Sequence, residues 1–539
     1  MKQQILNKRT PGFPIHYAKS ILIILGLCVI PQGFCQTAAL EESTATPKEF
    51  RFTIKHFTIE GSSPLSQAFM DDFFSPLQDR TYSLKELQDI SKAFEQKIHE
   101  LGYPFYRVVI PPQTLAQGTV KLQIISFTLG EIEVAGNEYF TRENIIASLP
   151  ILNKIESPNT QELSEALQVA NKHPSKQLNV IFKPSKIQDK LDTRISVAER
   201  HPIQASVIGN NYGTPSSGDY RIIGELQYSN LWGRDHVINA SYSTSPDHVD
   251  SVRQFGGSYS LPIYSLKGWL SAYYLESTVN IGTVATSLTV TGAGKMSGIH
   301  YQQYLPNLGR YGHSLNLGFD NRFFINDIQF QNTEIGSNVR STPVSALYKG
   351  DYPWQNINLT YYAQWLGNVG AGGQNSQANY EANRLNAAQD WNLVRFGSNL
   401  LVNVKSWLIQ TTLIGQQSQY SLIAGEQLGI GGSFDVRGYG QRETGADSGQ
   451  IVKFEVAAPP WQQINLFAFF DYGHGRLHST TPTQVKDWSL AGTGFGARFQ
   501  WRKYLLGNLT FANALKTAHA GTTQAGDSRI YFNVVYKLF

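Results

Sequence analysis

The sequence predicts a mainly β protein in which two small α/β modules precede a sixteen-stranded antiparallel transmembrane β-barrel. Three observations lead to this prediction. Helix-type patterns are confined to the first 200 residues, a strand-type alternation runs from about residue 201 to the end, and an export signal opens the chain. The composition agrees, because 47 glycines, 27 tyrosines and 29 phenylalanines in 539 residues fit an all-β protein better than a helical one.

Residues 1–36 have the pattern of a secretory signal peptide. Basic residues precede an apolar run at 21–30, which is too short to span a bilayer as a helix. An uncleaved anchor and a lipoprotein signal are the less favoured alternatives. Both cysteines, Cys28 and Cys35, lie in this segment, so we expect a mature chain without disulfides or a thiol nucleophile. Residues 37–49 are expected to form a linker.

The first module is predicted at residues 50–128. Alternation predicts a strand at 52–59, and apolar spacing predicts helices at 65–77 and 84–101. Ser83 and Glu86 have the spacing of a capping box before the second helix. Two further strands are predicted at 105–110 and 119–125, which gives the order β-α-α-β-β.

The second module, at residues 129–200, repeats this order. Strands are predicted at 131–135, 178–182 and 192–197, with helices at 141–149 and 159–171. Gly61 and Gly136 follow the first strand of each module. A single α+β domain of about 150 residues is the alternative, but the repeated order favours two modules. A three-stranded sheet of this kind leaves an open edge, which can accept an extended segment of another chain.

Residues 201–539 alternate between apolar and polar side chains in segments of about ten residues, typical of an outer-membrane barrel. About sixteen such segments can be counted. A soluble sandwich or propeller would also alternate, but the signal peptide, the long run without a helix and the terminal Phe539 favour the barrel. The polar face would line a lumen that has to be plugged at rest.

A glycine-rich loop at about 420–446 carries Arg437 at its tip, and this arginine needs a counter-charge. In the strand around residues 465–473, Asp471 and Gly473 have the polar parity and are predicted to face the lumen. If the loop folds inward, Asp471 is a natural partner for Arg437, and Gly473 removes a side chain that would obstruct the approach.

Two motifs carry a family resemblance: Val436-Arg437-Gly438-Tyr439 in the loop, and Phe470-Asp471-x-Gly473 in the strand. They resemble those of the two-partner secretion transporters, the haemolysin and filamentous-haemagglutinin secretion/activation proteins of the POTRA-plus-barrel superfamily. The resemblance implies that the two modules are POTRA domains in the periplasm and that the barrel lies in the bacterial outer membrane. It also implies an Arg437–Asp471 pair in the lumen, for which a contact between loop and wall is favoured over direct handling of the substrate.

The resemblance further implies the partners of the chain: an unfolded exoprotein, exported without ATP, and outer-membrane lipid, with the transporter a monomer or weak dimer. Possible substrate contacts lie on the second helix and the following strand of the first module, although an ordinary solvated helix face is an equally good interpretation. These residues are Lys85, Lys92, Lys97, Phe105 and Arg107. Residues 37–49 are too few for the plug helix and linker found in many family members, so we expect the inward loop to be the main obstruction.

Other classes of function find less support. A formal charge of +4 with 16% charged residues gives no basic field for nucleic acid. There is no HExxH, CxxC or GxSxG motif, and the histidines lack metal-ligand spacing, so we expect no enzyme, cofactor or metal. An assembly factor that inserts other barrels is the main alternative, and relatives with that role usually carry more than two POTRA domains. A passive porin would leave both modules unexplained.

Overall fold

The structure is a computed structural model. It describes residues 50–115, 118–153, 156–214, 217–279, 282–285, 288–290, 293–325, 329–330, 333–334 and 337–538. The predicted signal peptide, the linker and Phe539 lie outside these residues. Phe52–Phe539 forms one compact unit.

The first module is a three-stranded sheet covered by two helices. Its strands are β2 (His56–Glu60), β5 (Thr119–Ser126) and β4 (Tyr106–Val109), in that order, with β2 parallel and β4 antiparallel to β5. The helices are α1 (Gln67–Phe74), followed by a 3-10 turn at Ser75–Leu77, and α2 (Leu84–Glu100), which begins at the predicted capping box. Phe94, Ile98 and Leu122 are fully buried between helices and sheet.

The strand predicted at 52–59 is wrong in one respect, because it is two strands. β1 (Arg51–Ile54) pairs with β3 (Arg80–Ser83) in a separate small sheet, and only β2 joins the main sheet. The break lies at Lys55, whose backbone N–H, like that of His56, donates to the Gly118 carbonyl. Alternation continues through the break, so a change of partner leaves no mark on the pattern.

The second module repeats the first, as predicted. Its sheet has the order β6 (Thr128–Ala135), β8 (Lys190–Glu199) and β7 (Lys176–Pro184), again with one parallel and one antiparallel pairing. The helical segments are α3 (Arg142–Ala147), a 3-10 turn at Pro150–Asn153 and α4 (Thr160–Ala170).

Gly61 and Gly136 show how closely the two modules correspond. Both have positive φ, +97° and +87°, a conformation that favours glycine. A Cβ at either position would collide with a carbonyl oxygen of the central strand, that of Ile124 in the first module and that of Val197 in the second. Each glycine therefore ends the first strand of its sheet for the same reason.

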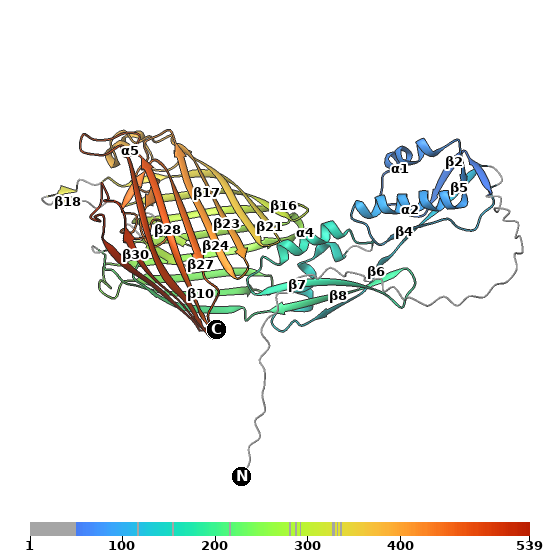
Figure 1. Ribbon diagram of the computed structural model, residues 1–539, viewed down its shortest axis with the longest axis horizontal. Coiled ribbons are helices and arrows are strands. Elements are labelled where there is room, and N and C mark those ends of the chain that lie inside the picture. The colour runs from blue at the N-terminus through green and yellow to red at the C-terminus, as the bar shows by residue number, and fades with distance from the viewer. Residues whose placement is uncertain are drawn as a thin grey trace, which may run out of the picture. The chain divides into compact units, whose positions relative to one another are not determined.

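The remaining chain forms a closed antiparallel barrel (Figure 1). β20 and β21 both pair with β17 and are interrupted only at Thr342, so the barrel has sixteen strands. The ring closes where β31 pairs with β9. In chain order the strands are β9 (Ile203–Asn210), β10 (Arg221–Leu231), β11 (His236–Thr244), β12 (Arg253–Ile263), β13 (Gly268–Ser277), β16 (Gly294–Leu308), β17 (Tyr311–Phe324), β20 (Val339–Ser341) with β21 (Pro343–Trp354), β22 (Ile357–Asn368), β23 (Asn392–Val404), β24 (Trp407–Ser418), β27 (Ser448–Ala457), β28 (Ile464–Arg476), β29 (Asp487–Trp501), β30 (Leu505–Ala514) and β31 (Ser528–Lys537).

The two faces of the barrel wall differ as the alternation predicted. In β28, Leu466 and Phe470 are exposed on the outer face, whereas Phe467, Phe469 and Asp471 are buried inside. Five of the exposed tryptophans stand at the ends of strands or in the short turns: Trp232, Trp354, Trp407, Trp461 and Trp501. An apolar outer face with aromatic side chains at its border is the pattern of a lipid-facing barrel.

Several short elements lie in the loops between barrel strands. They are a 3-10 turn at Tyr264–Leu266, the pair β14 (Gly282–Ala285) and β15 (Leu288–Val290), the pair β18 (Gln329–Phe330) and β19 (Thr333–Glu334), and α5 (Gln377–Asn383). Figure 1 shows α5 at one end of the barrel. None of the described helices is long and apolar enough to cross a membrane.

Candidate functional site

The loop between β24 and β27 is folded into the barrel. It contains a small hairpin, β25 (Leu428–Ile430) with β26 (Thr444–Ala446), which we call the stem, and residues 431–443, which we call the tip. Ile430, Val436 and Tyr439 are fully buried and pack against Ile451 and Leu490 of the wall. The inward position predicted from the sequence is therefore the one observed.

Arg437 at the tip binds two carboxylates of the wall, which we call the tip contact. Its Nε and Nη2 donate to the two oxygens of Asp471 at 2.6 and 2.8 Å, and its Nη1 donates to Glu455 at 3.0 Å. The backbone N–H of Arg437 also donates to Asp471, at 3.1 Å. Asp471 is completely buried. A bidentate, charge-assisted pair of this kind fixes orientation as well as position.

The guanidinium of Arg437 is also covered by an aromatic ring. Its centre lies 3.4 Å from the centroid of Phe469, and Arg498 lies in the same way over Phe467. Arg498 donates to the second oxygen of Glu455 at 2.5 Å, so Glu455 joins the two arginines. No role for Glu455 was predicted from the sequence, and Arg498 was missed. The parity of its strand was a signal that Arg498 faces the lumen, and in the structure Arg498 lies directly opposite the lumen-facing Asn465.

Two glycines of the wall make room for the tip. A Cβ at Gly473 would come within 2.6 Å of Ile430 and 2.9 Å of Val436, which agrees with the predicted reason for this glycine. A Cβ at Gly492 in β29 would collide with the carbonyl oxygen of Arg437 itself. Gly492 was missed because the sequence does not show which part of β29 the tip touches. Only the observed path of the tip shows this.

The other motif residues have distinct places. Gly438 has φ +104° and donates its N–H to the Tyr531 hydroxyl at 3.0 Å. The Tyr439 hydroxyl reaches the Lys516 carbonyl at 2.7 Å, which ties the tip to the loop between β30 and β31. Phe470 belongs to the second motif but faces outward and is exposed, so it makes no lumen contact.

The stem is held by ion pairs of its own, which we call the stem contacts. Glu426, before the stem, is fully buried and accepts from Arg322 of β17 at 2.8 Å. Asp447, after the stem, is fully buried and accepts from both terminal nitrogens of Arg384, at 2.5 and 2.9 Å. The loop is therefore attached at its tip and at both ends of its stem. Neither of these pairings was predicted, because both arginines lie far away in the chain.

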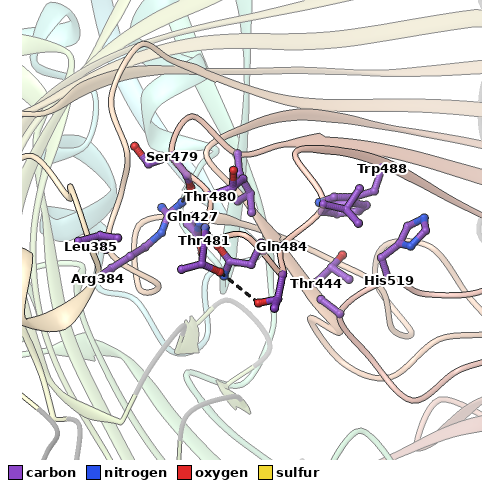
Figure 2. Close-up of a pocket in the computed structure, with 15 residues that line it drawn as sticks. Arg384, Leu385, Gln427, Thr444, Ser479, Thr480, Thr481, Gln484, Trp488 and His519 are labelled. Carbon is purple, nitrogen blue, oxygen red and sulfur yellow. Dashed lines mark hydrogen bonds between the residues drawn. The ribbon is translucent and has the colours of Figure 1, made fainter.

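A polar cavity of about 420 Å³ lies beside the stem (Figure 2). Stem residues line one part of it, and the loop between β28 and β29 lines another, where the Thr481 N–H donates to Gln484. Figure 2 also shows Arg384 and Trp488 at this cavity. The stem is therefore reached by solvent from the end of the barrel that carries α5.

Another buried ion pair joins the second module to the barrel, and we call it the turn contact. Lys176, at the start of β7, is fully buried and lies 2.5 Å from Asp235 in the turn between β10 and β11. Its ammonium also donates to Ser148 at 2.7 Å and Asn144 at 2.8 Å. The Tyr264 hydroxyl donates to Asp235 at 2.6 Å, so two barrel turns take part.

Burial changes the titration of this network. Burial and the nearby Lys176 lower the pKa of His173 to about 4, although Asp235 opposes the shift. Burial also lowers the pKa of Lys176, again opposed by Asp235. For Asp235, burial acts to raise the pKa, but the charge of Lys176 and the hydrogen bonds from Lys176 and Tyr264 outweigh it and lower the pKa. At ordinary pH, His173 is therefore neutral beside the Lys176–Asp235 pair.

Comparison with known proteins decides the family. The model of the haemolysin secretion/activation proteins ShlB, FhaC and HecB matches residues 190–499, more than half of the chain, and the ShlB-type POTRA model matches residues 52–126. The chain belongs to this secretion/activation family. Members of this family are outer-membrane transporters, with POTRA domains that face the periplasm.

Relatives and solved structures agree with this assignment. The heme/hemopexin transporter protein HuxB of Haemophilus influenzae is 20% identical over 74% of this chain and 71% of its own length. The outer membrane transporter CdiB of Escherichia coli is 21% identical over 83% of this chain and 76% of its own. The solved structure of Escherichia coli CdiB has a TM-score of 0.73 at 17% identity and covers 93% of each chain, and that of Acinetobacter baumannii CdiB has a TM-score of 0.65 at 14% identity and covers 90% of each. These structures share the fold.

The predicted substrate contacts of the transporter lie apart from the loop, on the first POTRA domain. Lys85, Lys92 and Lys97 are exposed along α2, and Arg107 is exposed on β4, which is an edge strand of its sheet. The Phe105 ring instead packs edge-on against Phe182 of the second POTRA domain, 4.9 Å between centroids. Substrate binding by these residues stays a prediction. Within the described part of the chain, no group of three His, Cys, Asp or Glu side chains has the arrangement of a metal site.

Proposed function

We propose that this transporter exports one secreted protein, which its POTRA domains bind unfolded in the periplasm and its barrel conducts to the cell surface. The observation that carries the proposal is the inward loop, whose tip contact occupies the lumen of a barrel preceded by POTRA domains. A passive pore has no use for either feature. Export by this route uses no ATP.

The first POTRA domain offers an edge on which an unfolded chain can add a strand. β4 pairs with β5 on one side only, and the basic residues of α2 lie on the same module. Main-chain hydrogen bonds to an edge strand give affinity without demanding one sequence. We infer that Lys85, Lys92 and Arg107 contact the exoprotein there, whereas Phe105 serves the packing between the two POTRA domains.

The outer face of the barrel supports outer-membrane lipid as the second partner. Exposed side chains such as Leu226, Phe495 and Leu509 alternate with lumen-facing ones, and tryptophans border this apolar face. A closed barrel can lie in lipid because no strand edge is left unpaired. One chain closes the ring alone, which supports a monomer as the working unit.

Deletion of the gene tests this function. Surface and secreted proteins of the deletion strain are compared with those of the parent strain by mass spectrometry. We expect one large exported protein to disappear from the surface, to accumulate or be degraded in the periplasm, and to return on complementation. An unchanged set of exported proteins, together with a loss of many other outer-membrane barrels, would instead identify an assembly factor.

A further inference from the structure

Four asparagines and one arginine occupy directly facing positions on five neighbouring strands of the inner wall of the barrel. Asn465 of β28 lies opposite Arg498 of β29, Arg498 lies opposite Asn508 of β30, and Asn508 lies opposite Asn533 of β31. Asn533 then lies opposite Asn210 of β9, so the row crosses the closure of the barrel. We call the four asparagines the amide row.

The amide row faces the lumen. Arg498 pairs with Glu455 inside the barrel, and directly opposite residues of antiparallel strands share one face of the sheet. Leu509, next to Asn508, and Ile530, three residues before Asn533, point to the other face, where they are 51% and 58% exposed and where lipid would lie. The row is therefore a polar stripe along the inside of the wall.

A cavity of about 760 Å³ opens along this stripe. Arg498 and three members of the row line it, namely Asn465, Asn508 and Asn533, together with Gln463 and Gln500. The turn between β29 and β30 also lines it, and this turn is bonded to the end of β31, where Lys537 pairs with Ser206 near the start of β9. The cavity therefore opens at the end of the barrel at which the chain arrives from the POTRA domains.

The chemistry of this surface suits a polypeptide main chain. Each side-chain amide offers a donor and an acceptor, which is what a peptide group requires, and it carries no charge that would select particular side chains. Among the residues that the structure describes, the amides of Asn533, Gln463 and Gln500 have no hydrogen-bond partner, and the Asn508 nitrogen has none either. These groups remain available to an extended chain.

Arg498 connects this surface to the loop. Its side chain is 41% exposed, whereas Glu455, to which it is bound, is nearly buried and is shared with Arg437. A chain in the cavity can therefore touch Arg498, and a change at Arg498 alters the carboxylate that holds the tip.

We propose that the amide row and Arg498 form the surface that first receives the extended main chain of the exported protein inside the barrel. The proposal rests on the proposed function and names the part of the lumen that carries it out. The row binds peptide groups without regard to sequence, and Arg498 conveys occupancy of the cavity to the tip contact through Glu455.

Site-specific cross-linking tests this in cells that produce the full chain. A photoreactive phenylalanine analogue replaces Asn508 or Asn533, and the probe is the exported protein lost in the deletion strain, fused to a disulfide-closed domain that stalls export. Asn399, whose amide oxygen is already bonded to Gln410 on another part of the lumen wall, and the lipid-facing Leu509 serve as controls. We expect cross-links at Asn508 and Asn533 and none at the controls. Equal cross-linking at Asn399, or none at the row while the probe is stalled, overturns the proposal.

A second measurement uses export itself. The double variant Asn508→Leu/Asn533→Leu should lower export about tenfold, which corresponds to about 1.4 kcal/mol for the two lost hydrogen bonds together. Asn399→Leu should leave export unchanged. Heat-modifiable migration in a gel shows that the barrels have folded. Normal export by a folded double variant contradicts the role of the amide row and leaves the proposed function intact. A parent strain that exports nothing through this chain contradicts the proposed function.

Discussion

The tip contact and the turn contact are both buried ion pairs, but they are built differently. In the tip contact, Arg437 binds Asp471 with two nitrogens and Glu455 with a third. In the turn contact, Lys176 binds a single carboxylate, Asp235, and fills its remaining donors with neutral oxygens. A guanidinium remains charged at every physiological pH, whereas a buried ammonium beside a histidine belongs to a network that titrates.

This difference teaches what each contact can do. The tip contact fixes one orientation of a loop within the lumen and responds to a competitor for its carboxylates. The turn contact joins the second POTRA domain to the barrel turns and responds to the proton concentration. Four variants or conditions separate the two contacts, beginning with the largest expected effect.

Arg437→Ala should impair export most while the barrel still assembles. The change leaves Asp471 buried without its cation, which typically costs about 3–5 kcal/mol, less where lumen water screens the charge. Export is measured from surface proteins, and folding from heat-modifiable migration. Arg476→Ala is the matched control, because Arg476 forms an exposed pair with Asp487 at 3.8 Å. Normal export by Arg437→Ala would show that export does not need the tip contact.

Lys176→Met should loosen the second POTRA domain from the barrel turns, because Asp235 is left buried without its cation. We expect the contact between the second POTRA domain and the barrel turns to lose about 3–5 kcal/mol of stability, with an effect at the turn and not at the tip. Hydrogen exchange in residues 229–236 is the measurement. The double variant Lys176→Met/Asp235→Leu, which removes both charges, should recover part of the protection, and Lys97→Met at an exposed pair should show no change. Equal exchange in all three variants contradicts the prediction.

Gly492→Ala tests the tip without altering any charge. The added methyl group collides with the Arg437 carbonyl oxygen, and overpacking of this kind costs about 1–3 kcal/mol. We expect partial loss of export and greater accessibility of the tip to an external protease. Gly224→Ala is the control, since a Cβ there meets nothing within 4 Å. If the two variants behave alike, the tip does not lie against β29.

Acid should weaken the turn contact. The pKa of His173 is about 4 in place and near its ordinary 6.5 once the module separates, so only the separated form takes up a proton between these values. Stability is therefore complete above pH 6.5 and falls as the pH drops toward 4, by about 1 kcal/mol at pH 5.5. The lowered pKa of Asp235 acts in the same direction at still lower pH.

Hydrogen exchange at pH 7.5 and 5.5, corrected for the intrinsic rate, measures this loss. His173→Gln should reduce the pH dependence in residues 229–236. A parent protein in which these residues exchange equally fast at both pH values, after that correction, would contradict the prediction.

The sequence was most informative where structure follows local pattern. Alternation predicted the barrel and the inward side of Asp471, and capping and apolar spacing predicted α2. The split of the first strand at Lys55 escaped notice because a change of pairing partner leaves alternation intact. The buried ion pair of Lys176 was not predicted for another reason. Lys176 opens an ordinary edge strand, and only the docking of the module onto the turn at Asp235 buries it.

The same limit applies inside the barrel. Arg437 and Asp471 stand in recognisable motifs, so their pairing was predictable. Arg322 and Arg384, which hold the stem, lie in a strand and a loop far from it in sequence, and Gly492 is significant only because the tip passes over it. Contacts of this kind depend on the path of a long loop, for which local pattern carries no information.

A double-mutant cycle between Arg437→Gln and Asp471→Asn tests the central claim most directly, because it asks whether the two residues act as one unit. Export and protease accessibility of the tip are measured for the parent, both single variants and the double variant. The account predicts that each single variant is impaired and that the double variant is no worse than the more impaired single one. Additive losses, or a single variant that exports normally, would contradict it.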